Sequence, residues 1–177
     1  NCKLNICDLF CYLSQSYPLT LDYLFQILRT IIKTCLALAE QNQRTSISFP
    51  AIGTGKLVFP KDLVAFVMFD EIFQFSCKNK VQHLQEVHLV LHPRDRDTIK
   101  AFTSQLEICT DAVLSGATNM QSAGTGSTFF GTVTNPSLGV HEMKIGSITY
   151  QVKTGDITKE DTEVIVNSSN RNFTLCK

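Results

Sequence analysis

Two glycines flank a threonine in the stretch SISFPAIGTGKLVFP, residues 46–60, which contains the letters GTGK. These letters also end the core of a nucleotide-binding P-loop. That motif needs another glycine five positions before Gly55, and a serine or threonine directly after Lys56. Here those two positions hold Pro50 and Leu57. The hydroxyl that would hold a magnesium ion is therefore missing, and the sequence excludes nucleotide hydrolysis of the P-loop type.

The same stretch keeps the features of an anion-binding loop. A short apolar run, residues 47–49, leads into it, and a helical pattern follows soon after. Successive N–H groups of Gly53, Thr54, Gly55 and Lys56 can converge on one point, and the small side chains let a diphosphate approach closely. An ordinary turn between a strand and a helix also needs glycine, and on these letters alone that alternative is favoured.

A second polar stretch, KTGDITKEDTEVIVNSSN at residues 153–170, surrounds a short apolar strand. Asp156 is a hydrogen-bond acceptor when ionised, whereas Asn167 and Asn170 offer both donors and an acceptor. Taken singly, each has a structural explanation. Aspartate after Gly155 suits a turn or a cap, and the asparagines suit the end of a strand.

The apolar pattern predicts an α/β fold. Helical spacing of apolar residues alternates with short, nearly continuous apolar runs, as in a sheet covered on both faces. A segment rich in Gly, Ser, Thr and Asn then reads as a linker, and a hairpin with its turn at Gly146-Ser147 follows it. The expected helices are 20–39, 60–77 and one starting near Asp97; the expected strands are 47–49, 86–92, 140–145, 148–157 and 163–166; the linker is 110–137.

Charge and cysteine usage exclude several classes of protein. Sixteen basic and sixteen acidic residues give no net charge, which disfavours nonspecific DNA or RNA binding. Seven cysteines include no CxxC pair, and Cys7 and Cys11 have no histidine nearby, so we expect reduced thiols and no metal site. His83, His88 and His92 flank or occupy one apolar strand and are interpreted as structural. We see no apolar run long enough for a membrane span and no secretory leader pattern.

Both polar stretches resemble macrodomains, the α/β/α modules that bind ADP-ribose. SISFPAIGTGKLVFP looks like the second ligand loop of that family. KTGDITKEDTEVIVNSSN looks like a macrodomain opening, with a Gly-Asp-Ile-Thr element and a strand ending in Val-Asn-x-x-Asn. The resemblance implies a three-layer α/β/α fold.

The order of the two stretches is reversed relative to a macrodomain, in which the Gly-Asp-Ile element comes early and the glycine loop late. The simplest explanation is two incomplete neighbouring modules joined by a flexible linker; a circular permutation is the alternative. The implied division is an unassigned segment 1–18, the C-terminal half of a first macrodomain at 19–108, a linker at 109–137 and the start of a second macrodomain at 138–177. Such an arrangement resembles the multi-macrodomain ADP-ribosyltransferases of the PARP family, of the B-aggressive-lymphoma type.

The resemblance implies a role for each matching residue. The carboxylate of Asp156 would accept a hydrogen bond from the adenine amine, and Asn170 would bind the distal ribose. The glycine loop would wrap the diphosphate and distal ribose of the other module. The implied ADP-ribose ligands are Gly53, Thr54, Gly55, Lys56, Leu57, Asp156, Ile157 (through its backbone N–H) and Asn170, with His92 or Pro93 against the adenine face.

Residues 49–59 contain no Asp, Glu or His that could activate a water, so no catalytic residue is predicted. The resemblance implies a reader of mono-ADP-ribosylated proteins that acts in ADP-ribose signalling and transcription regulation, in nucleus and cytoplasm. The parent protein would be an NAD-dependent ADP-ribosyltransferase, a glycosyltransferase, although this chain supplies no transferase site. An ADP-ribosyl hydrolase and a scaffold without ligand are the alternatives.

Overall fold

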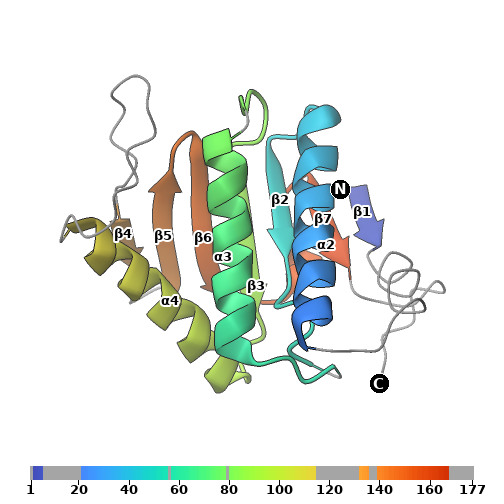
Figure 1. Cartoon of the computed structure of the whole chain (residues 1–177). Helices are drawn as coiled ribbons and strands as arrows, with labels where there is room; N and C mark the ends of the chain where they lie inside the picture. Colours follow the sequence, from blue (N-terminus) through green and yellow to red (C-terminus); the bar gives the residue numbers. More distant parts are fainter. Residues whose placement is uncertain are drawn as a thin grey trace.

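A computed structural model describes residues 2–5, 21–55, 57–78, 80–114, 132–135 and 139–167. Its centre is a seven-stranded sheet with the strand order β1-β7-β2-β3-β6-β5-β4 (Figure 1). The elements are β1 (Cys2–Asn5), α2 (Leu21–Gln41), β2 (Ser46–Phe49), α3 (Lys61–Lys78), β3 (Glu86–Leu91), α4 (Arg96–Leu114), β4 (Thr132–Asn135), β5 (Val140–Ile145), β6 (Ile148–Thr154), the 3₁₀ turn η2 (Ile157–Lys159) and β7 (Val164–Asn167).

Strands from both segments that resemble macrodomain pieces, residues 19–108 and 138–177, lie in this one sheet. β3 pairs with β6 in parallel over six residue pairs, from Glu86↔Thr149 to Leu91↔Thr154. β2 pairs in parallel with both β3 and β7, and β7 pairs in parallel with β1. Only the β4–β5 and β5–β6 pairs of the sheet are antiparallel. The division into two modules stays a prediction about the sequence, while in space the second segment flanks the first on both sides.

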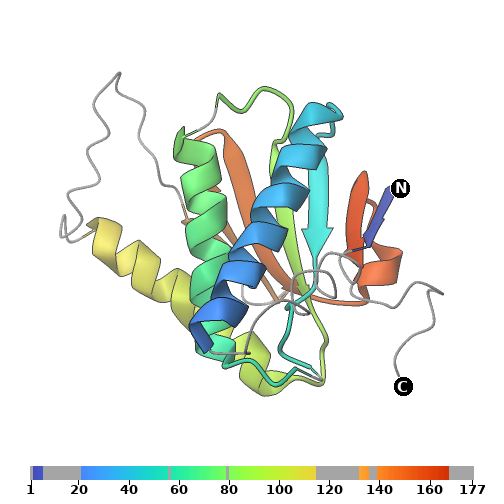
Figure 2. The same cartoon turned by 45° about the vertical axis from the view of Figure 1, so that its right-hand side comes forward.

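The three long helices cover one face of the sheet (Figure 2). α3 lies between α2 and α4, which explains why its sequence is apolar on more than one side. On this face the strands contribute buried apolar residues, and the Phe69 ring of α3 meets the Tyr150 ring of β6 edge-on at 5.9 Å. Arg29 of α2 reaches Asp70 and the buried Glu71 of α3, so an ion-paired contact joins the two helices.

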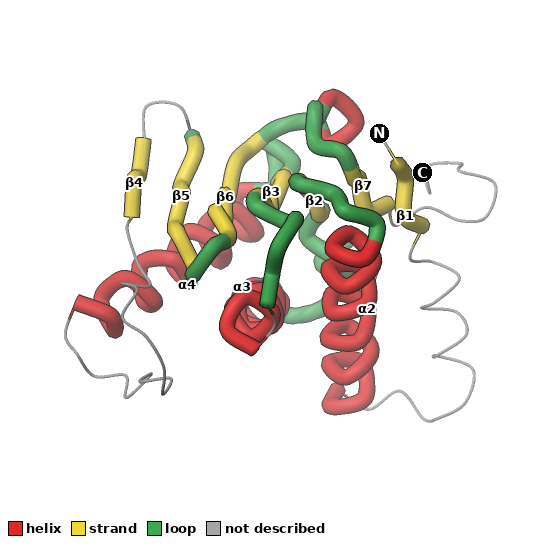
Figure 3. Tube along the Cα trace, turned by 90° about the horizontal axis from the view of Figure 1, so that it is seen from above, coloured by secondary structure: helices red, strands yellow, loops and turns green. Residues whose placement is uncertain are grey.

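The opposite face carries no α-helix among the described residues, and the second helical layer of the expected α/β/α arrangement stays a prediction. The α/β class itself, with a central sheet flanked by helices, is confirmed. The short helical turn between β6 and β7 lies on this second side (Figure 3). Polar side chains occupy the strands here, among them Ser48, His88, Gln151 and Lys153.

Three elements lie wholly or partly in segments for which the sequence predicted no regular structure. α4 continues to Leu114, six residues into the 109–137 segment, because Ala112, Val113 and Leu114 are compatible with a helix. β4 also lies inside that segment, and β1 lies inside the unassigned residues 1–18. The partner of β1 is β7, at the other end of the chain, so local periodicity could not reveal β1, whereas β4 pairs with the next strand, β5, and lies in a stretch whose composition indicated a linker. The predicted hairpin turn is confirmed, with Gly146 at φ +59°.

A buried hydroxyl pair joins the two segments and allows a test of the shared sheet. Ser48 and Thr162 are 0% and 2% exposed, and their hydroxyl oxygens lie 2.8 Å apart. Thr162 donates its proton to the Val164 carbonyl at 3.1 Å, so Ser48 is the donor between the two hydroxyls.

We expect Thr162→Val to lower the free energy of unfolding by about 1–3 kcal/mol, because it leaves the buried Ser48 hydroxyl without its acceptor. The double variant Ser48→Ala/Thr162→Val should be destabilised by less than the sum of the two single variants. Urea denaturation of the full chain, followed by circular dichroism, measures both. Strictly additive effects would contradict the pairing of β7 with β2.

Candidate ligand-binding edge

Five parallel strands end at one edge of the sheet, in the order β6-β3-β2-β7-β1. In Figure 1 their carboxyl ends lie toward the bottom of the view. In open α/β sheets, ligands bind outside the carboxyl ends of the strands. The predicted site residues follow three of these described ends: Asp156 and Ile157 follow β6, His92 and Pro93 follow β3, and the glycine loop follows β2.

The structure therefore brings together residues that the sequence assigned to two separate modules. Lys56 and Asn170 lie outside the described residues, so their predicted roles are not placed. The shared edge of the two sets of residues was not predicted from the sequence. The available signal was the strand pattern itself, because parallel neighbours with short apolar runs bring their carboxyl ends together.

The glycine loop is held by its own backbone. Phe59 N–H donates to the Gly53 carbonyl and Val58 N–H to the Gly55 carbonyl, both at 3.0 Å. Thr54 N–H turns back toward the Ala51 carbonyl at 3.4 Å, and its hydroxyl donates to the same oxygen at 2.9 Å. Thr54 N–H is thus partly engaged. Of the predicted amides, those of Gly53 and Gly55 have no acceptor recorded within the described chain.

Gly53 and Gly55 differ in what surrounds them. Gly53 has φ +83°, and a Cβ atom there would come within 2.5 Å of the Phe59 ring, so a side chain is excluded. Gly55 is exposed, and a Cβ atom there would meet nothing within 4 Å. Gly53 is therefore needed for the shape of the loop, whereas Gly55 leaves open space in front of the backbone that a ligand can use.

Val58 adopts the left-handed conformation, with φ +52°, although it is β-branched. This conformation is a genuine outlier for such a residue. Val58 and Leu57 are 79% and 48% exposed, so packing of these side chains does not compensate for the strain. The loop thus presents a strained apolar tip beside the edge, and strain of this kind clusters at binding sites.

Asp156 is the N-cap of η2. Its Oδ1 accepts from the Thr158 N–H at 3.0 Å and from the Thr158 hydroxyl at 2.7 Å. These hydrogen bonds are the main reason that the pKa of Asp156 lies below its ordinary value, and the nearby His92 contributes in the same direction. The exposed carboxylate is therefore ionised at neutral pH and acts only as an acceptor. The structural explanation of Asp156 as a cap is correct, and it leaves Oδ2 outside these two hydrogen bonds.

His92 and Pro93 are exposed next to Asp156. The Gly155 N–H donates to the Leu91 carbonyl at 2.9 Å and so joins the end of β6 to the end of β3. His92 Nδ1 accepts from the Arg94 N–H at 3.2 Å. A ring that accepts at Nδ1 carries its proton on Nε2, so the free nitrogen of His92 is a donor and not a base.

In the described part of the chain the metal-ligating side chains are dispersed, and one cysteine is deeply buried. Its His, Cys, Asp and Glu side chains form no group of three or more that could hold a metal ion. Burial raises the pKa of Cys35 to about 12, which leaves this thiol protonated. Among the described helices, none is both long and apolar enough to cross a membrane.

Comparison with known proteins identifies the family of the segment that contains the glycine loop. Residues 24–68, which include the loop, match the model of the family described as Macro domain. This chain carries macrodomain sequence. The resemblance inferred from the residues is thereby confirmed, and the loop between β2 and α3 lies within the matched residues.

Two relatives extend the macrodomain match. Human protein mono-ADP-ribosyltransferase PARP14 is 45% identical over 150 residues, which cover 85% of this chain and 8% of that protein. Mouse protein mono-ADP-ribosyltransferase PARP9 is 38% identical over 82 residues, 46% of this chain and 9% of that protein. The chain thus spans less than a tenth of the length of either of these relatives.

We expect Val58→Gly to raise the free energy of unfolding by about 1 kcal/mol, because a left-handed conformation costs a residue with a side chain about 1–2 kcal/mol. Urea denaturation measures the change. The neighbouring variant Leu57→Gly is the matched control: no positive φ is recorded there, so it should be neutral or destabilising. Equal effects of the two substitutions would show that the turn is not strained in solution.

Proposed function

We propose that this chain forms one ADP-ribose-binding site at the carboxyl edge of the sheet, built from both of its segments, and that it reads mono-ADP-ribosylated proteins. The observation that carries the proposal is the parallel pairing of β2, β3 and β6, which sets the glycine loop, His92 and Asp156 side by side along one edge. The reversed order of the motifs then does not require two incomplete ADP-ribose sites in separate modules.

The chemistry along this edge suits the parts of ADP-ribose in order. An ionised Asp156 accepts from an exocyclic amine and therefore favours adenine over a base with an oxo group at that position. His92 and Pro93 offer a flat and an apolar surface against the base. The amides of Gly53 and Gly55 suit the diphosphate, with open space in front of Gly55 for its approach. Lys56, Leu57 and Asn170 keep their proposed roles at the diphosphate and distal ribose.

Binding is favoured over hydrolysis because no general base is recorded at the loop. Residues 49–59 contain no Asp, Glu or His. The ring nitrogen of His92 that remains free carries a proton in the recorded hydrogen-bonding arrangement. Asp156 is occupied as a cap, and its depressed pKa makes it a weak base. An ADP-ribosyl hydrolase is the second candidate, since a carboxylate and an imidazole do lie together at this edge.

The wider role is inferred from the relatives. Both are named protein mono-ADP-ribosyltransferases, so the parent of this chain is proposed to use NAD as a substrate elsewhere in its sequence. The match to PARP14 covers 150 residues and therefore extends beyond residue 137, into the segment 138–177. This supports the proposal that both segments belong to one continuous chain. Action in ADP-ribose signalling and transcription regulation, in nucleus and cytoplasm, and partners that carry mono-ADP-ribose belong to the same proposal.

Isothermal titration of the full chain with ADP-ribose tests the proposal. We expect one ligand per chain. Asp156→Ala should weaken binding about tenfold or more, as expected for loss of a hydrogen bond to a charged group. Gly55→Val should also weaken binding about tenfold or more, by filling the space in front of the loop, while leaving the stability unchanged because the site of its Cβ is open.

Asp161→Ala is the matched control, because Asp161 is an exposed aspartate five residues after Asp156 and should leave affinity unchanged. Absence of heat with ADP-ribose would overturn binding. Binding that responds to only one of the two site substitutions would overturn the single composite site. Loss of label from an ADP-ribosylated protein incubated with the chain would establish the hydrolase instead.

A further inference from the structure

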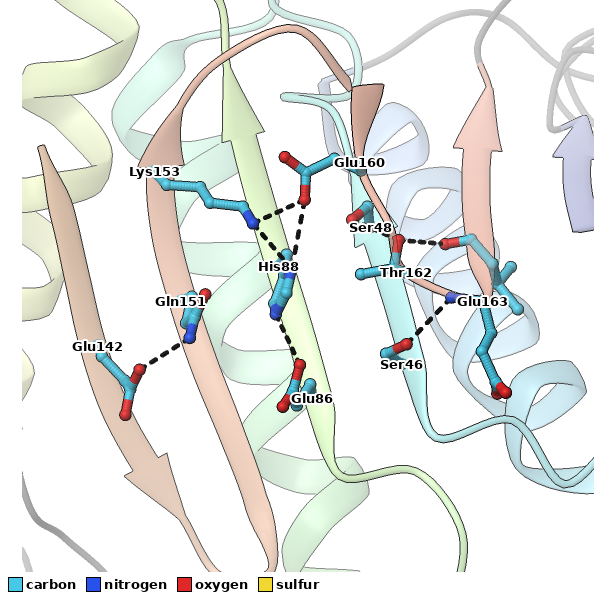
Figure 4. A network of polar contacts seen from close by, with 11 residues as sticks. Ser46, Ser48, Glu86, His88, Glu142, Gln151, Lys153, Glu160, Thr162 and Glu163 are labelled. Atoms are coloured by element: carbon cyan, nitrogen blue, oxygen red, sulfur yellow. Dashed lines mark hydrogen bonds and ion pairs between the residues drawn. The ribbon is translucent and has the colours of Figure 1, made fainter. Parts of the chain in front are cut away.

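Residues 155–163, here called the crossover segment, carry Asp156 and cross one face of the sheet. β6 ends at the carboxyl edge and β7 starts at the amino edge, with β3 and β2 between them. The chain must therefore return from one edge to the other across two strands. Figure 4 shows it doing so over the face opposite the three long helices, above the polar side chains of β3 and β2.

Hydrogen bonds hold both ends of the crossover segment, among them one from the Thr45 N–H to the Glu163 carboxylate at 2.7 Å. At its start, Gly155 N–H donates to the Leu91 carbonyl. At its end, Thr162 is bonded to Ser48, and Glu163 N–H donates to the Ser46 hydroxyl at 3.0 Å. The recorded hydrogen bonds of the Asp156 carboxylate come from Thr158, and its backbone carbonyl accepts from the Lys159 N–H at 2.9 Å, so they orient the carboxylate relative to η2 and not relative to the sheet.

A charged group joins the middle of the segment to the sheet. The Glu160 carboxylate, with its side chain 12% exposed, lies 2.6 Å from Lys153 Nζ of β6. Lys153 Nζ also lies 3.1 Å from His88 Nδ1 of β3. On the other side of the ring, His88 Nε2 lies 3.1 Å from the Glu86 carboxylate. These contacts form a chain from the crossover segment through β6 to β3 (Figure 4).

One arrangement of protons satisfies this chain. Glu86 can only accept, so His88 Nε2 donates to it, and Nδ1 is then an acceptor for the Lys153 ammonium. Lys153 has further protons and donates one to Glu160. His88 Nδ1 and Glu160 Oε2, 3.4 Å apart, are then both acceptors and are bridged by the lysine. A neutral imidazole and a charged lysine thus direct the Glu160 carboxylate to one position.

We propose that Glu160, held by Lys153 and His88, is a positioning residue that sets where the Asp156 carboxylate stands relative to the glycine loop, and thereby sets the preference of the site for adenine. The proposal rests on the function proposed above. Glu160 lies one residue after η2, which Asp156 caps, so displacement of Glu160 moves the short turn as a unit. The glycine loop is shaped separately, by its own internal hydrogen bonds.

The test compares ADP-ribose with inosine diphosphate ribose, in which an oxo group replaces the exocyclic amine. In the unmodified chain we expect the dissociation constant for the inosine ligand to be about tenfold or more higher, because its oxo group faces a carboxylate. The preference for adenine is then the ratio of the dissociation constant for the inosine ligand to that for ADP-ribose. In Glu160→Gln and in Lys153→Met this ratio should fall by about threefold or more. Lys153→Arg, which keeps the charge, should retain the ratio.

The ratio separates positioning from stability, because a variant that is merely less stable binds both ligands less well in equal proportion. Glu142→Gln is the matched control: Glu142 accepts from Gln151 at 2.7 Å on the same face and has no recorded contact with the crossover segment. Circular dichroism monitors folding. If Glu160→Gln does not fold, Glu160→Asp, which keeps the charge but shortens the reach to Lys153, is used in its place and should lower the ratio in the same way.

The outcomes distinguish the two proposals. No binding of ADP-ribose by the unmodified chain overturns the proposed function and this inference together. Equal affinity of the unmodified chain for both ligands overturns the adenine contact of Asp156 and this inference, while binding itself stands. A ratio that persists in Glu160→Gln, or in Glu160→Asp where that variant is used, overturns the positioning role alone.

Discussion

The parallel pairing of β3 with β6 is the constraint on which the site depends. It joins strands that lie more than fifty residues apart in the sequence, over the full length of β3. Because the strands run in the same direction, the chain leaves both at the same edge, and the loops after the two strands are brought together. An antiparallel register would place Asp156 at the opposite end of the sheet from His92 and from the glycine loop.

A second consequence of this pairing is the path of the crossover segment. Consecutive strands that run parallel in one sheet need a crossover connection, commonly of about a dozen residues or more and often helical. Here a short segment with a single 3₁₀ turn suffices, so it lies directly on the sheet and must satisfy polar groups as it passes. Ser48 and His88, nearly buried in the middle of two strands, are explained by this path, since each bonds to it or to a side chain that does.

Local features were predictable from the sequence, whereas the assembly was not. Periodicity placed α2, α3 and the start of α4, and the Gly146 turn placed the β5–β6 hairpin. Nothing in VIVN specifies whether β7 pairs with β2, because a short apolar strand fits many neighbours and parallel register is set by contacts distant in sequence. The positive φ of Val58 was equally hidden, since the local letters there favour extended backbone and the turn is imposed by its flanking hydrogen bonds.

The site also shows why structural and functional explanations of one residue need not compete. Asp156 caps η2 through Oδ1, and this use fixes the rotamer of a surface carboxylate that would otherwise lose side-chain entropy on binding a ligand. The internal hydrogen bonds of the glycine loop act in the same way on its amides. Groups already held by the fold lose less entropy when a ligand orders them, so the features that made each residue look merely structural in the sequence are those that prepare the edge to bind.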